Sequence, residues 1–147
     1  MHIEQATLKH LDAVSGLFDR YRQFYRQPPD AEGAHRFIEE RMRNGDAHIL
    51  CAIADGDVAG FAQLYPFPDS IAMAPAWLLH DLYVDEAFRR RGIARRLLHA
   101  VRAVGERSAA SVLTLATGIN NTSAQALYES EGWTRDDEYY YYDLHLR

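Results

Sequence analysis

A strand that runs through a short basic turn into a helix, at residues 81–98, constrains the fold of this chain more than any other segment. Leu82 and Val84 alternate with polar neighbours as in a strand, and apolar residues recur at helical spacing from Ile93 onward. The first turn of a helix has N–H groups without internal partners and a partial positive charge, so the junction at Gly92 is predicted to bind phosphate. The alternative is a solvated helix start that is rich in arginine. The arginines around this junction are Arg89, Arg90, Arg91, Arg95 and Arg96.

Two common phosphate-binding motifs are absent from this junction. No Gly-Lys-Ser/Thr follows, which excludes a Walker A loop, and no G-x-G-x-x-G opens the helix, which excludes the dinucleotide fingerprint. What remains is R-x-x-G-x-A directly after a strand. This pattern resembles the acyl-CoA pyrophosphate loop of the GNAT superfamily, the Gcn5-related N-acetyltransferases. The resemblance implies that acetyl-CoA is the co-substrate and that these residues bind it: Arg89, Arg90, Arg91, Gly92, Ile93, Ala94 and Arg95.

A second motif of the same superfamily, N-x-x-A-x-x-L-Y-x-x-x-G-[FW], lies within residues 118–133. By resemblance, Tyr128 is the general acid that protonates the CoA sulfur, and Asn121 hydrogen-bonds the CoA arm. A phenol has a proton to donate at neutral pH because its reference pKa is ~10. The alternatives are a packed aromatic ring for Tyr128 and a helix cap for Asn121. The residues that fill the motif are Asn121, Ala124, Leu127, Tyr128, Gly132 and Trp133.

The strand before the loop carries further residues that the resemblance implicates. The backbone of Leu82, Tyr83 and Val84 is expected to pair with the pantetheine amides as an added strand, and a β-bulge there would make the Leu82 N–H the oxyanion donor. His80 stands where the similar run of the polyamine acetyltransferases has the glutamate that acts on the amine. Histidine is a suitable base near pH 7, so His80 is the expected base, with a surface or capping role as the alternative. Asp81 is expected either to bind a cationic substrate or to be structural.

Aromatic residues are candidates for the acceptor site. Tyr25 ends an apolar helical stripe that begins at Leu11, and core packing is the alternative interpretation of that stripe. The run 136–143 is acidic and rich in tyrosine, which suits a cationic amine through Coulomb and cation–π attraction. A half-buried strand beside a solvated turn is the alternative there. The predicted substrate-binding residues are therefore Asp81 and Tyr25.

The remaining pattern predicts a single α/β domain over residues 1–147. The expected order is strand, two helices, three strands, helix, strand, helix and two strands, and Pro66 and Pro68 are expected to end the third strand. The resemblance implies the GNAT fold, in which a central mixed seven-stranded sheet is splayed between strands 4 and 5 and flanked by about four helices. The last two strands are expected to begin at Trp133 and to span 139–146.

Composition narrows the class of protein further. The chain has 147 residues and a net charge of −5, which argues against nucleic acid as a partner. No apolar run approaches the ~20 residues that span a bilayer, and no secretory signal is recognisable, so we expect a cytoplasmic protein without a membrane partner. Cys51, the single cysteine, is expected to be a buried apolar residue. The histidines lack ligand spacing, so we expect no metal.

These observations together predict an N-acetyltransferase that transfers an acetyl group from acetyl-CoA to a primary amine by direct attack in a ternary complex. The expected acceptor is a small cationic amine. A protein N-acetyltransferase acting on a lysine or an N-terminus and a non-catalytic acyl-CoA-binding module are the alternatives. A homodimer is also expected, because members of the superfamily often dimerise and an exposed last strand can pair across an interface.

Overall fold

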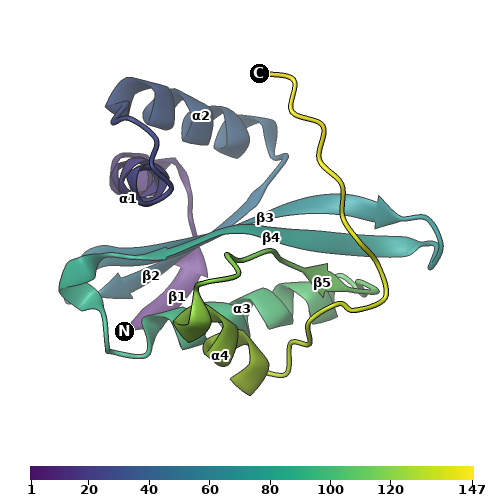
Figure 1. Ribbon diagram of the computed structural model, residues 1–147. Helices are drawn as coiled ribbons and strands as arrows, with labels where there is room; N and C mark the ends of the chain where they lie inside the picture. Colours follow the sequence, from purple (N-terminus) through teal and green to yellow (C-terminus); the bar gives the residue numbers. More distant parts are fainter. The chain divides into compact units, whose positions relative to one another are not determined.

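A five-stranded mixed sheet forms the centre of the first of two units, Met1–Ala116 and Thr117–Arg147, which are described separately. The computed structural model describes all residues, 1–147. Figure 1 shows α1 (Leu11–Phe24) and α2 (Ala31–Asn44) on one face of the sheet and α3 (Ile93–Arg107) on the other. The strands are β1 (His2–Gln5), β2 (His48–Ala54), β3 (Asp57–Asp69), β4 (Ala74–Val84) and β5 (Leu113–Thr114).

The sheet changes from antiparallel to parallel pairing at its β5 edge. Strands β1 to β4 pair as antiparallel neighbours in chain order, and β5 runs parallel to β4. The β4–β5 pairing covers only Trp77 with Leu113 and Leu78 with Thr114. The later part of β4 therefore pairs with β3 on one side and has no β5 partner on the other. The predicted mixed α/β sheet is confirmed.

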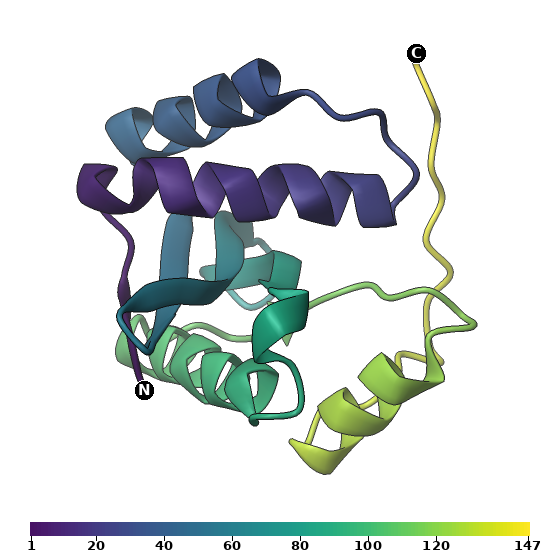
Figure 2. The ribbon, with the colours of Figure 1, turned by 90° about the vertical axis from the view of Figure 1, so that its left-hand side faces the viewer.

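Local sequence signals explain where the helices begin and end. The Asp30 side chain accepts a hydrogen bond of 2.9 Å from the Gly33 N–H and so caps α2, which ends at Gly45 with φ of 64°. Figure 2 shows α1 and α2 side by side, and α1 contributes Val14, at 0% exposure, to the core beneath them. No helix is both long enough and apolar enough to cross a membrane.

The prediction of a seven-stranded sheet is wrong for this chain, whose sheet has five strands. Residues after α4 (Thr122–Ser130) form no strand, although the tail has the alternation of one. A strand requires a neighbour for its backbone N–H and C=O groups, and residues 134–147 pair with none. Tyr140 and Tyr142 on this tail are each 90% exposed.

The expected end of the third strand at Pro66 and Pro68 is also wrong, since β3 continues to Asp69 and pairs with β4 from Gly60 to Asp69. Pairing between β3 and β2 stops at Leu64 with His48, so β3 has a free edge beyond that point. Pro66 and Pro68 are two residues apart, so their backbone nitrogens face the same edge of the strand. Their missing N–H groups can therefore face this edge, where no hydrogen bond is lost.

Truncation of the α3 core contact should destabilise the first unit. Leu97 is fully buried, at 0% exposure. We expect Leu97→Ala to lower the free energy of unfolding by about 2–5 kcal/mol, because it removes buried methyl groups and leaves a cavity. Urea unfolding followed by circular dichroism measures this. Arg102→Ala on the exposed side of the same helix is the control and should change it by less than ~1 kcal/mol. Equal effects of the two substitutions would contradict the packing described here.

Candidate active site

A β-bulge in β4 organises the candidate active site. Gln63 on β3 lies opposite Asp81, and the next residue, Leu64, lies opposite Leu79, so His80 is the additional residue of the bulge. In a regular strand, His80 and Asp81 would point to opposite faces of the sheet. A bulge changes the direction of side chains. The His80 ring can therefore reach its own neighbour, and its Nδ1 lies 2.9 Å from Asp81 Oδ1.

The Asp81 carboxylate is buried and accepts two hydrogen bonds. Asp81 is 4% exposed, and its Oδ2 accepts a hydrogen bond from Gln63 Nε2 at 2.7 Å. Because Nδ1 of His80 faces a carboxylate oxygen, that nitrogen carries the proton of the neutral ring, and Nε2 is left with the lone pair. The hydrogen bond to Asp81 raises the pKa of His80 above its ordinary value, while partial burial of the ring opposes this effect. This arrangement suits a general base.

Two tyrosines from other elements contact His80. The Tyr21 hydroxyl on α1 donates a 3.1 Å hydrogen bond to the His80 carbonyl. The Tyr65 ring on β3 packs against the His80 ring, with centroids 5.5 Å apart. Burial raises the pKa of Tyr65 to about 12, and the Asp81 charge adds to this effect. Tyr65 therefore remains a neutral phenol beside the base.

An open hollow of about 490 Å³ lies beside His80. Within it, Arg41 Nε donates a 2.8 Å hydrogen bond to Asp46 Oδ1, and the guanidinium lies 4.6 Å above the Phe37 ring. The Arg41 charge is thus held by a carboxylate and by an aromatic face. The hollow offers aromatic surface, one carboxylate and a base to a ligand. Its lining residues are Phe37, Arg41, Asp46, Tyr65 and His80.

Tyr25, a predicted substrate-binding residue, does not line this hollow. It lies just beyond α1, 50% exposed, with its ring against those of Tyr21 and Phe24 at 5.1 and 5.2 Å. Its contact with substrate stays a prediction. The hollow could not be predicted from the sequence, because it forms only where the fold brings α2 and the bulge of β4 together. Gln63 did leave a signal, since it is the one amide side chain within a buried strand.

The predicted phosphate-binding turn connects β4 to α3 through a short 3-10 helix, Glu86–Phe88. Gly92 is the N-cap of α3, has φ of 74° and provides no side-chain cap. A glycine suits this position because a side chain at such φ would be strained. Arg89 Nε donates to the Val84 carbonyl at 3.2 Å. The turn thus presents a helix N-terminus without a side chain in front of it.

Arg91 in the same turn is paired with a carboxylate of the chain. Its two terminal nitrogens lie 2.9 and 3.4 Å from the Asp55 oxygens, on the turn between β2 and β3. This bidentate contact lowers the pKa of Asp55. The Arg91 charge is therefore partly compensated by Asp55.

The predicted pantetheine-binding segment, Leu82 to Val84, lies on the part of β4 that has no β5 partner. On its other side, Leu82 pairs with Ala62 and Val84 with Gly60 of β3. The bulge at His80 comes just before this segment. The backbone edge of β4 is thus available for peptide-like hydrogen bonds from an extended ligand.

The second unit carries the other predicted motif. Asn121 Oδ1 accepts a 3.2 Å hydrogen bond from the Ala124 N–H and so caps α4. Tyr128 lies in the last turns of α4, with its ring centroid 6.2 Å from that of Trp133. Gly132, with φ of 90°, follows the helix. Asn121 and Tyr128 therefore belong to this unit, whereas His80, Asp81 and β4 belong to the first.

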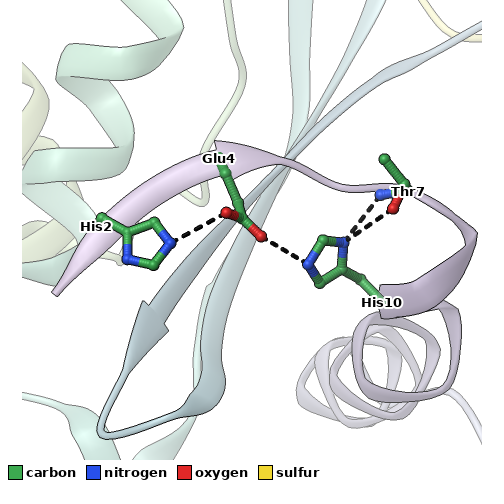
Figure 3. Close-up of polar contacts among 4 residues, drawn as sticks. All are labelled: His2, Glu4, Thr7 and His10. Atoms are coloured by element: carbon green, nitrogen blue, oxygen red, sulfur yellow. Dashed lines mark hydrogen bonds and ion pairs between the residues drawn. The ribbon is translucent and has the colours of Figure 1, made fainter.

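A group of possible metal ligands that the sequence analysis did not anticipate lies near the N-terminus, where Glu4, His10 and Cys51 come within 4.8 Å of one another. Figure 3 shows that Glu4 also contacts His2, at 3.0 Å, and that His10 Nδ1 accepts from the Thr7 N–H at 3.0 Å. His10 Nε2 must then carry the ring proton, which it donates to Glu4 at 2.8 Å. Burial raises the pKa of the Cys51 thiol to about 11. His10 Nε2 and the Cys51 thiol therefore both carry a proton. These residues fit a structural hydrogen-bond cluster better than a metal site.

Comparison with known proteins agrees with the two motifs. Residues 14–133 match the acetyltransferase (GNAT) family. The chain is 38% identical to the uncharacterized N-acetyltransferase YhfO of Bacillus subtilis, over 99% of this chain and 98% of that protein. It is 28% identical to an aminoglycoside N(6')-acetyltransferase type 1 of Salmonella typhimurium, over 97% of each.

Solved structures give the same result. A crystal structure of a probable acetyltransferase has 37% identity and a TM-score of 0.95, over 100% of this chain and 99% of that one. An aminoglycoside N-acetyltransferase in complex with CoA shares the fold, with 23% identity and a TM-score of 0.80 over 97% of this chain and 93% of that one. The chain belongs to the GNAT family. It is an acetyl-CoA-dependent N-acetyltransferase.

The His80–Asp81 contact predicts a measurable shift in titration. Asp81→Asn should lower the pKa of His80, because the hydrogen bond to a charged partner is lost while the partial burial of the ring remains. The NMR titration of the His80 ring measures this, with Asp46→Asn as the control that removes a charge elsewhere in the hollow. We expect Asp46→Asn to change the pKa of His80 clearly less than Asp81→Asn does. An unchanged His80 midpoint in Asp81→Asn would contradict the contact.

Proposed function

We propose that this N-acetyltransferase acts on a small cationic primary amine, which binds in the hollow beside His80. The observation that carries the proposal is the His80–Asp81 pair at the bulge, because it places a base with a defined proton position next to an open hollow. The amine arrives as an ammonium ion and must lose a proton before it can attack a thioester. His80 Nε2 is the group that takes it.

The charges around the hollow favour a cationic acceptor. Asp81 and Asp46 are both negative, and the one cation that lines the hollow, Arg41, already has Asp46 at 2.8 Å and Glu40 at 3.8 Å. The aromatic rings of Phe37 and Tyr65 add cation–π surface. Relatives named as aminoglycoside acetyltransferases support an amine of this class.

The reaction proceeds by direct transfer. After His80 has taken a proton, the amine nitrogen attacks the thioester carbonyl carbon, and the Leu82 N–H stabilises the oxyanion. The C–S bond then breaks, Tyr128 donates its phenolic proton to the departing thiolate, and the acylated nitrogen loses its second proton to solvent. Solvent restores the proton of Tyr128 and removes that of His80. Acetylated amine and CoA with a free thiol are the products.

Acetyl-CoA binding uses the turn before α3 and the open edge of β4. Backbone N–H groups at the start of α3 bind the pyrophosphate, and Arg89 and its neighbours add charge. The pantetheine arm pairs with the backbone of Leu82, Tyr83 and Val84. The Asn121 side chain is proposed to hydrogen-bond the CoA arm. The complex of a relative of the same fold with CoA supports this co-substrate.

Thiol release across a panel of amines tests the proposed function, with acetyl-CoA binding measured in parallel by calorimetry. Tyr128→Phe should retain binding of acetyl-CoA and lower kcat by about 10²- to 10⁴-fold, because the general acid is lost. The panel includes monoamines, polyamines, aminoglycosides and lysine peptides. Ile71→Ala, at a 96% exposed position between β3 and β4, is the control and should behave as wild type.

Each outcome of this assay has a defined meaning. Turnover with polyamines or aminoglycosides supports the proposal, whereas turnover with peptides alone favours a protein acetyltransferase. Tight binding of acetyl-CoA without turnover of any amine favours a non-catalytic binding module. Absence of binding contradicts both the proposal and these alternatives.

The chain is further proposed to form a homodimer through its tail. Residues 139–146 alternate like a strand, yet Tyr142, Leu144 and Leu146 are 85–90% exposed. Exposed apolar segments of this kind mark interaction surfaces. Light scattering should give a dimer for the full chain and a monomer after removal of residues 139–147. A monomeric full chain would contradict the dimer.

A further inference from the structure

We propose that Gln63 is a positioning residue, whose amide holds Asp81 as the charged acceptor that orients His80. The inference rests on the proposed role of His80 as the base. Gln63 does not contact the hollow, and it acts only through the buried carboxylate. Its side chain reaches Asp81 from the neighbouring strand because the two residues are direct partners in the β3–β4 register.

The orientation of the Gln63 amide is the observation that carries this inference. Gln63 is fully buried, at 0% exposure, and its Nε2 donates to Asp81 Oδ2 at 2.7 Å. Its Oε1 is also buried and has no hydrogen-bond partner in the protein. A buried acceptor without a partner is unfavourable, and most buried polar atoms avoid that state. The fold therefore retains this amide at a cost, which points to a role outside packing.

Comparison with the reverse orientation of the Gln63 amide shows what the observed orientation does for Asp81. It would place Oε1 of Gln63 against Oδ2 of Asp81, which is tolerable only if a proton lies between the two oxygens. The observed orientation, with N–H toward the carboxylate, gives a charged Asp81 a donor at Oδ2. Asp81 then accepts from Gln63 at one oxygen and from His80 at the other. The His80 proton is held on Nδ1, and Nε2 is kept free to receive the proton of the amine.

The other groups near His80 cannot take over this function. Tyr65 packs against the ring, and Tyr21 binds the backbone carbonyl of His80. Arg41 and Asp46 line the hollow and are paired with each other. Among the hydrogen bonds of Asp81, the one from Gln63 is the only side-chain contact that comes from another strand. Loss of this N–H would release the Asp81 carboxylate from its fixed position, which would weaken its hydrogen bond to His80 and lower the pKa of His80.

Substitution by a residue of similar shape without a donor separates this role from packing. Gln63→Met should lower kcat at pH 7 by about 10-fold, with an unchanged KM for acetyl-CoA, because positioning partners typically contribute factors of this size. The acid limb of the pH–rate profile should move downward by about half a unit to one unit. Leu64→Met, at the next buried position of β3, is the matched control and should leave the profile unchanged.

The ¹⁵N chemical shifts of the His80 ring provide a readout that needs no turnover. The wild type should show the Nδ1–H tautomer when neutral, and Gln63→Met should show a mixture of tautomers. A wild-type ring in the Nε2–H form would overturn the inference even if the variant fails to fold. A lower kcat in Gln63→Met with an unchanged tautomer and acid limb would also overturn it. Failure of every amine to react would count against the proposed function instead, since the tautomer still reports on Gln63.

Discussion

The buried carboxylate of Asp81 is the interaction on which the candidate active site depends. A charge at 4% exposure is stable only when hydrogen bonds replace its hydration, and Asp81 has one from each side, from Gln63 and from His80. The bulge makes this possible, since it brings the side chains of two consecutive residues together. Strand irregularity, buried charge and the proton position of His80 are thus parts of one arrangement.

One strand serves both substrates in this account. At His80, the side chain of β4 faces the proposed acceptor hollow between α2 and the sheet, and the buried Asp81 contacts that side chain. From Leu82 to Val84, the backbone of the same strand has an edge without a β5 partner, which suits the pantetheine arm. The strand then leads into the turn at Gly92. The acyl carbon and the amine are therefore expected to meet near the bulge, where a backbone N–H and a base lie close in sequence.

The sequence predicted the parts of this protein that depend on local pattern and missed those that depend on register. The turn at Gly92 and the family itself could both be recognised from the order of residues. The contact of Gln63 with Asp81 could not, because it requires the strand pairing and the position of the bulge. The prediction of strands in the tail was wrong because a local pattern was taken as sufficient. Alternating tyrosines such as Tyr140 satisfy a strand pattern without providing a partner strand.

Chemical rescue of His80→Gly with imidazole tests the central claim, that His80 is the general base, most directly. The side chain of His80 is 56% exposed, so a small base can reach the space that it leaves. The account predicts that His80→Gly loses thiol release with an amine acceptor while it retains acetyl-CoA binding, and that added imidazole restores the rate in a saturable way. Undiminished activity of His80→Gly without imidazole would contradict it.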